Sequence, residues 1–145
     1  MASRQEVDFD IVSDNWTRFR LEDRTILRVR IDVAKIAFHG TSNIGFPNVE
    51  VAARNIVTAV VEDPSLKGVP AKEEVKLRPE DVQSGKEMKV EQMDSNWQEY
   101  KILGTPWKLL VRPIVPKVIR TQKYNQFGEP IYWASIQFVT DVKKV

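Results

Sequence analysis

A repeat at a spacing of 81 to 83 residues constrains the fold of this 145-residue chain more than any other feature. The segments that align are Glu6–Leu21 with Glu87–Ile102, Leu27–Ala37 with Leu109–Ile119, Gly45–Pro47 with Gly128–Pro130, and Val49–Val60 with Ile131–Val142. Of the 42 aligned positions 14 are identical, and they include an Asn-Trp pair and a Gly-x-Pro corner, which are not generic features of β-rich segments. We therefore predict a duplication: two similar β units, residues 6–60 and 87–142, joined by a connector, residues 61–86, in a single domain spanning residues 1–145.

Each unit has the pattern of β-strands. From Leu27 to Val33 apolar residues alternate with charged ones, which is typical of a strand with one solvated face. Trp16–Leu21 alternates in the same way and is the predicted hairpin partner. These two segments, together with Glu6–Val12 and Val49–Val60, make four strands, and their repeats bring the total to about eight. The sequence thus predicts an all-β fold, either a closed barrel or a two-layer sandwich.

Three segments carry local signals that go beyond the strand pattern: two strands of the second unit and one part of the connector. Pro113 and Pro116 interrupt the repeat of Leu27–Ala37, and because proline donates no ladder hydrogen bond, that strand is predicted to lie at an edge or to be bulged. Ile131–Val142 is apolar on both faces, which is typical of a central or covered strand. Residues 78–82 place a proline and two acids together, as the start of a short helix does.

The residue composition excludes several kinds of chemistry. The chain has no cysteine and one histidine, His39, which excludes disulfides, thiolate metal sites and multi-histidine metal sites. A catalytic triad would depend on His39 alone, and no recognisable acid or nucleophile motif accompanies it. All six glycines are isolated, so the sequence has no glycine-rich phosphate loop. We expect no catalytic residue, no metal and no cofactor.

Charge and hydropathy place the chain in an ordinary class. Its 22 basic and 20 acidic residues leave a net charge of +2, which is too small to indicate a nucleic-acid or membrane partner. No apolar run approaches the roughly 20 residues that a membrane span needs. The N-terminal residues lack the apolar core of a signal peptide. We therefore expect a cytoplasmic protein without a membrane partner.

A basic and aromatic stretch in the second unit is a candidate nucleic-acid surface. Between Tyr100 and Phe127 there is no acidic residue, whereas cations and aromatic rings alternate along the segment. Cations pair with phosphates and rings stack on unpaired bases. The predicted binding residues are Arg112, Lys117, Arg120, Lys123 and Tyr124. The competing interpretation is a solvated face with aromatic residues in the core, since the chain lacks a strong basic excess.

An apolar strip in the second unit is a candidate partner surface. Leu110 and Ile114 occupy the positions at which the first unit has Arg28 and Asp32, so this strip needs a cover. Phe127 stands beside a Gly-x-Pro corner, and an aromatic residue at a loop tip often anchors a protein contact. The predicted partner surface is thus Leu110, Ile114 and Phe127.

The first unit carries an arginine-rich sheet face. The arginines expected to share it are Arg18, Arg20, Arg28 and Arg30. The acids expected to pair with them across strands are Glu22, Asp23 and Asp32. We interpret this face as solvated structure, because exposed ion pairs of this kind contribute only ~0–1 kcal/mol.

No motif in the sequence defines a reaction. The first functional interpretation is a non-enzymatic binding or assembly module, acting as a homodimer or on a protein partner through its second unit. The alternative is single-stranded nucleic-acid binding through the basic and aromatic residues. The third is an enzyme with a pocket of polar groups between the two units.

Overall fold

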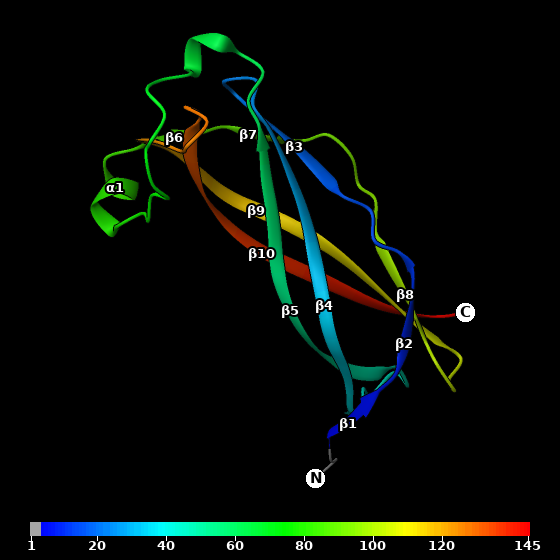
Figure 1. The fold of residues 1–145 in the computed structure, drawn as a ribbon. Helices are drawn as coiled ribbons and strands as arrows, with labels where there is room; N and C mark the ends of the chain where they lie inside the picture. Colours follow the sequence, from blue (N-terminus) through cyan, green and yellow to red (C-terminus); the bar gives the residue numbers. More distant parts are fainter. Residues whose placement is uncertain (1–3) are drawn as a thin grey trace.

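The computed structural model describes residues 4–145, which form two β-sheets of five strands each (Figure 1). Sheet A contains β1 (Arg4–Val7), β3 (Thr17–Leu21), β4 (Ile26–Thr41), β5 (Pro47–Val60) and β7 (Val90–Gln92). Sheet B contains β2 (Phe9–Ser13), β6 (Lys86–Met88), β8 (Gln98–Ile102), β9 (Trp107–Tyr124) and β10 (Pro130–Lys144). The predicted all-β class is confirmed, with ten strands instead of about eight.

The extra strands arise because the first predicted strand of each half is split in two. The first predicted strand is interrupted at Asp8, so that β1 pairs with β4 in sheet A whereas β2 crosses to sheet B and pairs with β8. The corresponding strand of the second half is interrupted at Lys89, so that β6 pairs with β9 in sheet B whereas β7 crosses to sheet A and pairs with β3. Each half therefore contributes one short strand to the other half's sheet.

The two sheets pack face to face and do not close into a barrel. Two clusters of buried side chains join them: one includes Ile31 of sheet A with Tyr100 and Leu109 of sheet B, and the other includes Phe19 with Val118. The long strands of the two sheets cross obliquely instead of pairing (Figure 1). The closed-barrel alternative is therefore wrong, and each sheet keeps free edges.

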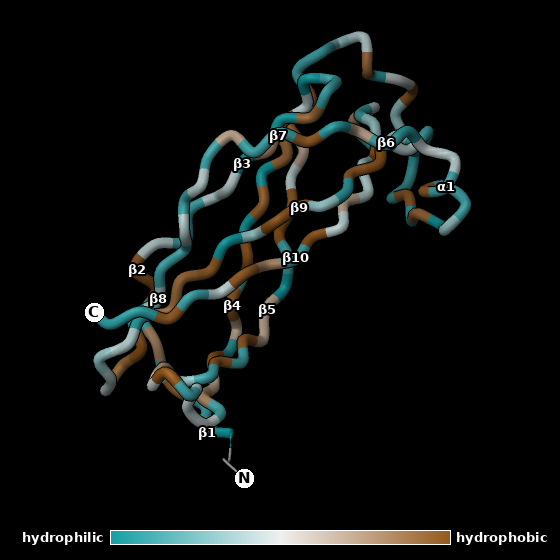
Figure 2. The backbone as a smooth tube through the Cα atoms, turned by 180° about the vertical axis from the view of Figure 1, so that it is seen from behind, coloured by the Kyte–Doolittle hydropathy of each residue, from teal (hydrophilic) through white to brown (hydrophobic). Residues whose placement is uncertain are grey.

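Alternation along the long strands positions this core. Leu27, Val29 and Ile31 of β4 are almost fully buried, while Arg28 and Arg30 between them lie on the outer face of sheet A. Figure 2 shows hydrophobic positions recurring along the long strands, as the period of two requires. The strand predicted from this alternation is confirmed as the N-terminal half of β4.

Ladder pairing gives another offset for the last segment of the predicted repeat than the sequence alignment does. Leu27 pairs with Ala59, and its aligned counterpart Leu109 pairs with Val142. Positions that match in the two ladders are thus 83 residues apart, whereas the sequence alignment of Val49–Val60 used 82. The sequence alignment and the ladders thus differ by one residue in this strand, and a shift of one residue places every side chain on the opposite face.

The prolines of β9 lie where this strand lacks a neighbour on one side. β9 pairs with β8 up to Val111 and with β6 from Val118 onward, so Pro113 and Pro116 fall between these two partners. On its other side β9 pairs with β10, and the register shifts near Pro116. The predicted bulge is confirmed. β9 is not an edge strand, because it has partners on both sides along most of its length. Its two prolines, which lack an N–H group, lie in the gap between β8 and β6, where no ladder hydrogen bond is needed.

The corresponding gap in β4 is filled by a side chain. Pairing of β4 with β3 stops at Val29 and pairing with β1 starts at Ile36. The buried Gln98 amide reaches Ile31 between them: it accepts a hydrogen bond from the Ile31 N–H at 2.9 Å and donates one to the Ile31 carbonyl at 2.6 Å. It also donates to the Tyr100 hydroxyl. Gln98 therefore acts as a one-residue strand partner inside the core.

The connector is docked on the β9–β10 turn. It contains a 3-10 turn, η1 (Pro64–Leu66), and the helix α1 (Pro79–Gln83), which confirms the short helix predicted there. The Gly68 N–H donates to the Gly128 carbonyl at 2.8 Å, and the Ala71 N–H donates to the Asn125 carbonyl at 2.9 Å. These backbone contacts hold the connector against one end of sheet B (Figure 1).

Candidate functional site

One side of the molecule, here called the edge side, is formed by the free edges of β5 and β10. In the described part of the chain β5 pairs only with β4, and β10 only with β9. The two strands contact each other across the layers. The apolar segment Ile131–Val142, predicted to be central or covered, thus lies in an edge strand. Its outward edge is a row of backbone donors and acceptors without a strand partner.

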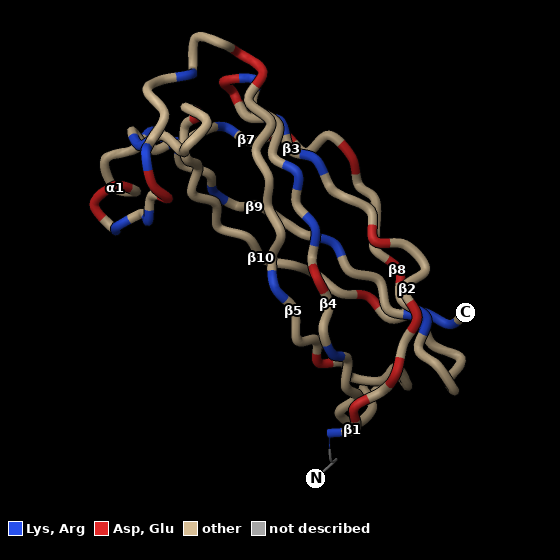
Figure 3. The backbone as a smooth tube through the Cα atoms, viewed as in Figure 1, with Lys and Arg blue, Asp and Glu red and all other residues tan. Residues whose placement is uncertain are grey.

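These two edges carry few of the residues that usually protect a free strand. Of the 14 residues of β5 only Glu50 and Arg54 are charged, and β10 has no charged residue from Pro130 to Thr140. Figure 3 shows this difference from the more densely charged strands β3 and β4. Long, weakly charged edges readily pair with another strand, which natural proteins usually prevent with lysine, proline or short strands.

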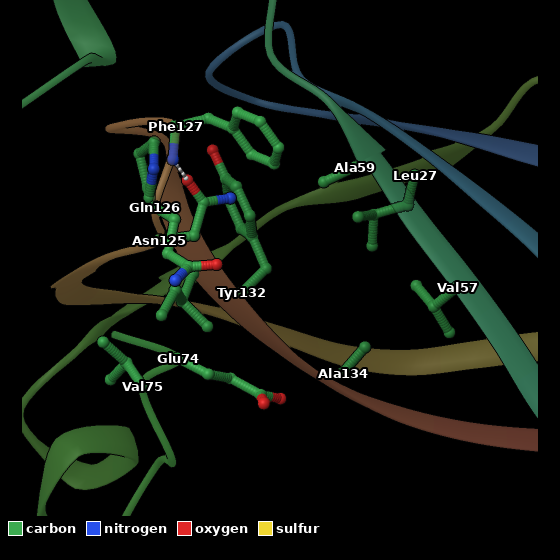
Figure 4. A pocket seen from close by; sticks show the side chains of 12 residues that line it. Leu27, Val57, Ala59, Glu74, Val75, Asn125, Gln126, Phe127, Tyr132 and Ala134 are labelled. Atoms are coloured by element: carbon green, nitrogen blue, oxygen red, sulfur yellow. Dashed lines mark hydrogen bonds between the residues drawn. The ribbon is translucent and has the colours of Figure 1, made fainter. Parts of the chain in front are cut away.

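A hollow of about 350 Å³ opens between the two edges (Figure 4). Its lining is mainly apolar and includes Val57 and Ala59 of β5, and Tyr132 and Ala134 of β10. Phe127 stands at its rim in the β9–β10 turn and is 80% exposed. The enzyme alternative would require polar groups in this space between the halves. Most of the lining is instead apolar.

A buried network supports the floor of this hollow. The Tyr132 hydroxyl donates to Asp23 at 2.6 Å, Arg120 donates to the same carboxylate at 3.0 Å, and the Thr25 N–H donates to its other oxygen. Burial by itself would raise the pKa of Asp23, but the hydrogen bonds from Tyr132, Thr25 and Arg120 together hold that pKa below its usual value. Burial and the neighbouring Asp23 raise the pKa of Tyr132. The pair therefore stays a phenol donating to a carboxylate, which is a structural role.

Most of the predicted nucleic-acid residues already have partners within the chain. Arg112 lies over the Trp97 ring at 4.6 Å, Lys117 is 3.6 Å from Glu87, and Arg120 binds Asp23. Lys123 is exposed, and half-buried Tyr124 packs its ring on Gly68. The side chains therefore do not gather as one free basic surface, and nucleic-acid binding stays a prediction.

The predicted partner-surface residues are separated in the fold. Leu110 is 8% exposed, so it offers little area to a partner. Ile114 is half-buried on β9, beside Val115 and Pro116. Only Phe127 of these three lies on the edge side. Nothing in the sequence marked β5 as a free edge, whereas the uncharged run of β10 could be read directly from it.

The arginines of the first half find partners other than the expected ones. Arg18 pairs with Asp94 at 3.0 Å and Arg30 with Asp14 at 2.7 Å. The predicted acid Asp32 instead pairs with Arg54. Arg28 and Arg30 also lie over the Trp16 ring, as Arg112 lies over Trp97 in the second half. The shared Asn-Trp motif thus supplies a ring on which a sheet arginine stacks in both halves.

The single histidine does not line the apolar hollow. His39 is exposed on β4, opposite Arg4 of β1. Among residues 4–145 no group of three His, Asp or Glu side chains is placed to hold a metal ion. No helix in this described range is long and apolar enough to span a bilayer.

Comparison with family models, curated proteins and solved structures gave no match. The fold defines the class: an all-β protein of two five-stranded sheets that exchange short strands. Its function is therefore inferred from the two free edges, the apolar hollow and the charged outer face of sheet A.

Proposed function

We propose that this protein is a non-enzymatic assembly module, and that two copies join by antiparallel pairing of their β5 edges. The observation that carries this proposal is the placement of the only two charges on β5. Glu50 and Arg54 lie two residues either side of Ala52, on the outer face of a long strand whose edge has no partner in the described chain. That edge is therefore self-complementary.

Pairing centred on Ala52 matches these charges twice. In an antiparallel ladder with Ala52 on the two-fold axis, Glu50 of each copy stands opposite Arg54 of the other. Directly opposite side chains in such ladders lie roughly 4.5–5.5 Å apart, which is within reach of an ion pair. Exposed pairs contribute only ~0–1 kcal/mol each, so backbone hydrogen bonds supply most of the attraction and the charges select the register.

A two-fold pairing also limits growth. Because an isologous contact uses the same edge of both copies, it ends with two chains, whereas a head-to-tail contact would continue into a filament. β10 contacts β5 on the same side of the molecule, so a second copy seated on β5 also approaches the uncharged part of β10. The exposed Phe127 and Val57 add apolar area there.

We also infer that the two halves, residues 6–60 and 87–142, are copies of one ancestral unit within a single domain. The strand order supports this inference, since β1–β5 and β6–β10 occupy corresponding places in the two sheets and exchange their second strands reciprocally. The paired Trp16 and Trp97 stacks support it as well. Under this duplication β5 and β10 are counterparts, and each unit brings one long free edge to the edge side.

Charge exchange at two positions tests the proposed contact. Glu50→Arg places like charges opposite each other twice, and Arg54→Glu does the same with the opposite sign, so each variant should weaken association about tenfold or more. The double variant Glu50→Arg/Arg54→Glu restores both opposite pairs and should recover the association. Sedimentation velocity across a dilution series measures all four proteins.

The stability of each variant must be measured as a control, because both side chains also form ion pairs within the chain. Glu50 also pairs with Arg4, and Arg54 with Asp32, and both pairs are exposed, so the free energy of unfolding of each single variant should stay within about 1 kcal/mol of the wild type. A wild type that remains a monomer at high concentration sinks the proposal. A double variant no better than the singles would show that the two positions do not face each other.

A further inference from the structure

A second hollow, on the outer face of sheet A, is lined by arginine. It lies beside the β3–β4 turn and has a volume of about 590 Å³. The residues that line it are Arg18, Arg20, Arg24, Ile26, Glu62 and Met93. Three positive charges and one negative charge give this lining a net charge of +2. Figure 3 shows the basic positions of β3 that lead to it.

Two of the three guanidinium groups are available to a ligand. Arg18 donates its Nε to Asp94 at 3.0 Å, whereas Arg20 and Arg24 form no ion pair within the part of the chain that the structure describes. Acids do lie nearby: Glu62 lines the hollow, and Glu91 stands opposite Arg20 in the β3–β7 ladder. Asp63 is close enough to Arg24 for the guanidinium charge to contribute to lowering the pKa of its carboxyl, after the hydrogen bonds from Ser65. These acids reduce the positive potential of the hollow but form no ion pair with the guanidinium groups of Arg20 and Arg24 within the described residues.

The backbone at Arg24 is the second observation. Arg24 has a φ of 71° and is the only non-glycine residue with positive φ among residues 4–145. The corresponding left-handed positions in the other three hairpin turns are Gly45, Gly104 and Gly128. This conformation favours glycine because a Cβ clashes with the following carbonyl. The chain thus holds an arginine, in the one turn beside this hollow, where glycine would fit with less strain.

We propose that this hollow binds a phosphate-bearing anion through Arg20 and Arg24, with the free end of Arg18 assisting. Guanidinium groups offer planar pairs of N–H donors that match phosphate oxygens, and two or three of them around one hollow suit a diphosphate. Met93 and Ile26 provide an apolar wall for the rest of such a ligand. The site lies on β3 and its turn, so it does not depend on the proposed β5 contact.

Calorimetric titration with inorganic pyrophosphate at low ionic strength tests this site. The wild type should bind one equivalent saturably, and Arg20→Gln and Arg24→Gly should each weaken binding about tenfold or more. The matched control is Arg78→Gln, which removes an exposed arginine from the connector and should change the affinity by less than about twofold. Arg24→Gly should also melt at the same or a higher temperature, because glycine relieves the turn.

A parallel titration with adenosine diphosphate identifies the source of the phosphate. Tighter binding than pyrophosphate indicates a nucleotide-like ligand with its base on the apolar wall, and equal binding indicates recognition of the phosphates alone. Absence of saturable binding by the wild type overturns the proposal. So does an affinity that falls equally in Arg78→Gln, since that result would mean attraction by overall charge only.

Discussion

At the scale of single residues, Gln98 joins the buried polar groups of the core. It is fully buried and satisfies both backbone groups of Ile31 in the gap between β3 and β1, as well as the Tyr100 hydroxyl. Burial raises the pKa of Tyr100, although the hydrogen bond to Gln98 lowers it in part. The polar groups around Gln98 therefore form a connected set in which each member depends on the others for its hydrogen bonds.

Gln98→Leu should lower the free energy of unfolding by about 2–4 kcal/mol, because it leaves the Ile31 N–H and carbonyl buried without partners. Urea denaturation followed by tryptophan fluorescence measures the loss. The matched control is Gln122→Leu on the exposed part of β9, which should stay within about 0.5 kcal/mol of the wild type. Equal losses in the two variants would contradict the role given to the Gln98 amide.

At the scale of elements, the connector is held to sheet B by close backbone approach at Gly128. This residue has a φ of 76°, and a Cβ placed on it would lie 2.6 Å from the Gly68 carbonyl oxygen. Gly104, in the β8–β9 turn, has a φ of 74°, and a Cβ placed there would meet no atom within 4 Å. The two glycines thus share a backbone conformation and differ in their surroundings.

Gly104→Ala should cost about 1 kcal/mol of stability from the left-handed conformation alone. Gly128→Ala should cost at least about 2 kcal/mol, since the connector must also move away from the turn. Chemical denaturation gives both values, and proteolysis within residues 61–86 reports whether the connector has come loose. Similar costs without new cleavage would show that the Gly68–Gly128 contact does not hold the connector.

The elements that the sequence predicts well are those with strong alternation. The apolar period from Leu27 to Val33 locates β4, and the proline with two acids locates α1. The crossing strands β2 and β7 are missed, because breaks of one residue at Asp8 and Lys89 leave the alternation almost unchanged. The alignment of Val49–Val60 with Ile131–Val142 differs by one residue from the offset in the ladders, because identical Ala, Val and Thr residues favour the smaller offset.

The candidate sites were harder to predict than the strands. The basic residues of β9 form a cluster in the sequence, but three of the four cationic side chains contact residues from distant segments. These partners are Trp97, Glu87 and Asp23. Conversely, Arg24 gains its significance from a φ angle, and Glu50 and Arg54 gain theirs from lying on a free edge. Neither property is visible in a single sequence, because the φ of Arg24 depends on the exact type of the β3–β4 turn and the free edge of β5 depends on long-range pairing.

At the scale of the whole molecule, the strand exchange and the free edges are linked. The short strands β2 and β7 cover one flank of each sheet, whereas the long strands β5 and β10 remain uncovered on the opposite flank. The protein therefore ends in short strands on one flank and in long strands on the other, and the long free edges offer more backbone groups for pairing with another chain. The proposed two-fold contact at Ala52 is the simplest arrangement that satisfies the β5 edge and matches its charges.

The most direct test of that contact is a cysteine cross-link, because the chain has no cysteine of its own. Ala52→Cys should form a disulfide-linked dimer of twice the 16.7 kDa chain mass under mild oxidation, since both introduced thiols lie beside the two-fold axis. Thr58→Cys, exposed on the same strand, should remain a monomer on the same non-reducing gel, because its two thiols would lie far apart. Efficient cross-linking of Thr58→Cys, or none of Ala52→Cys, would contradict the proposed dimer.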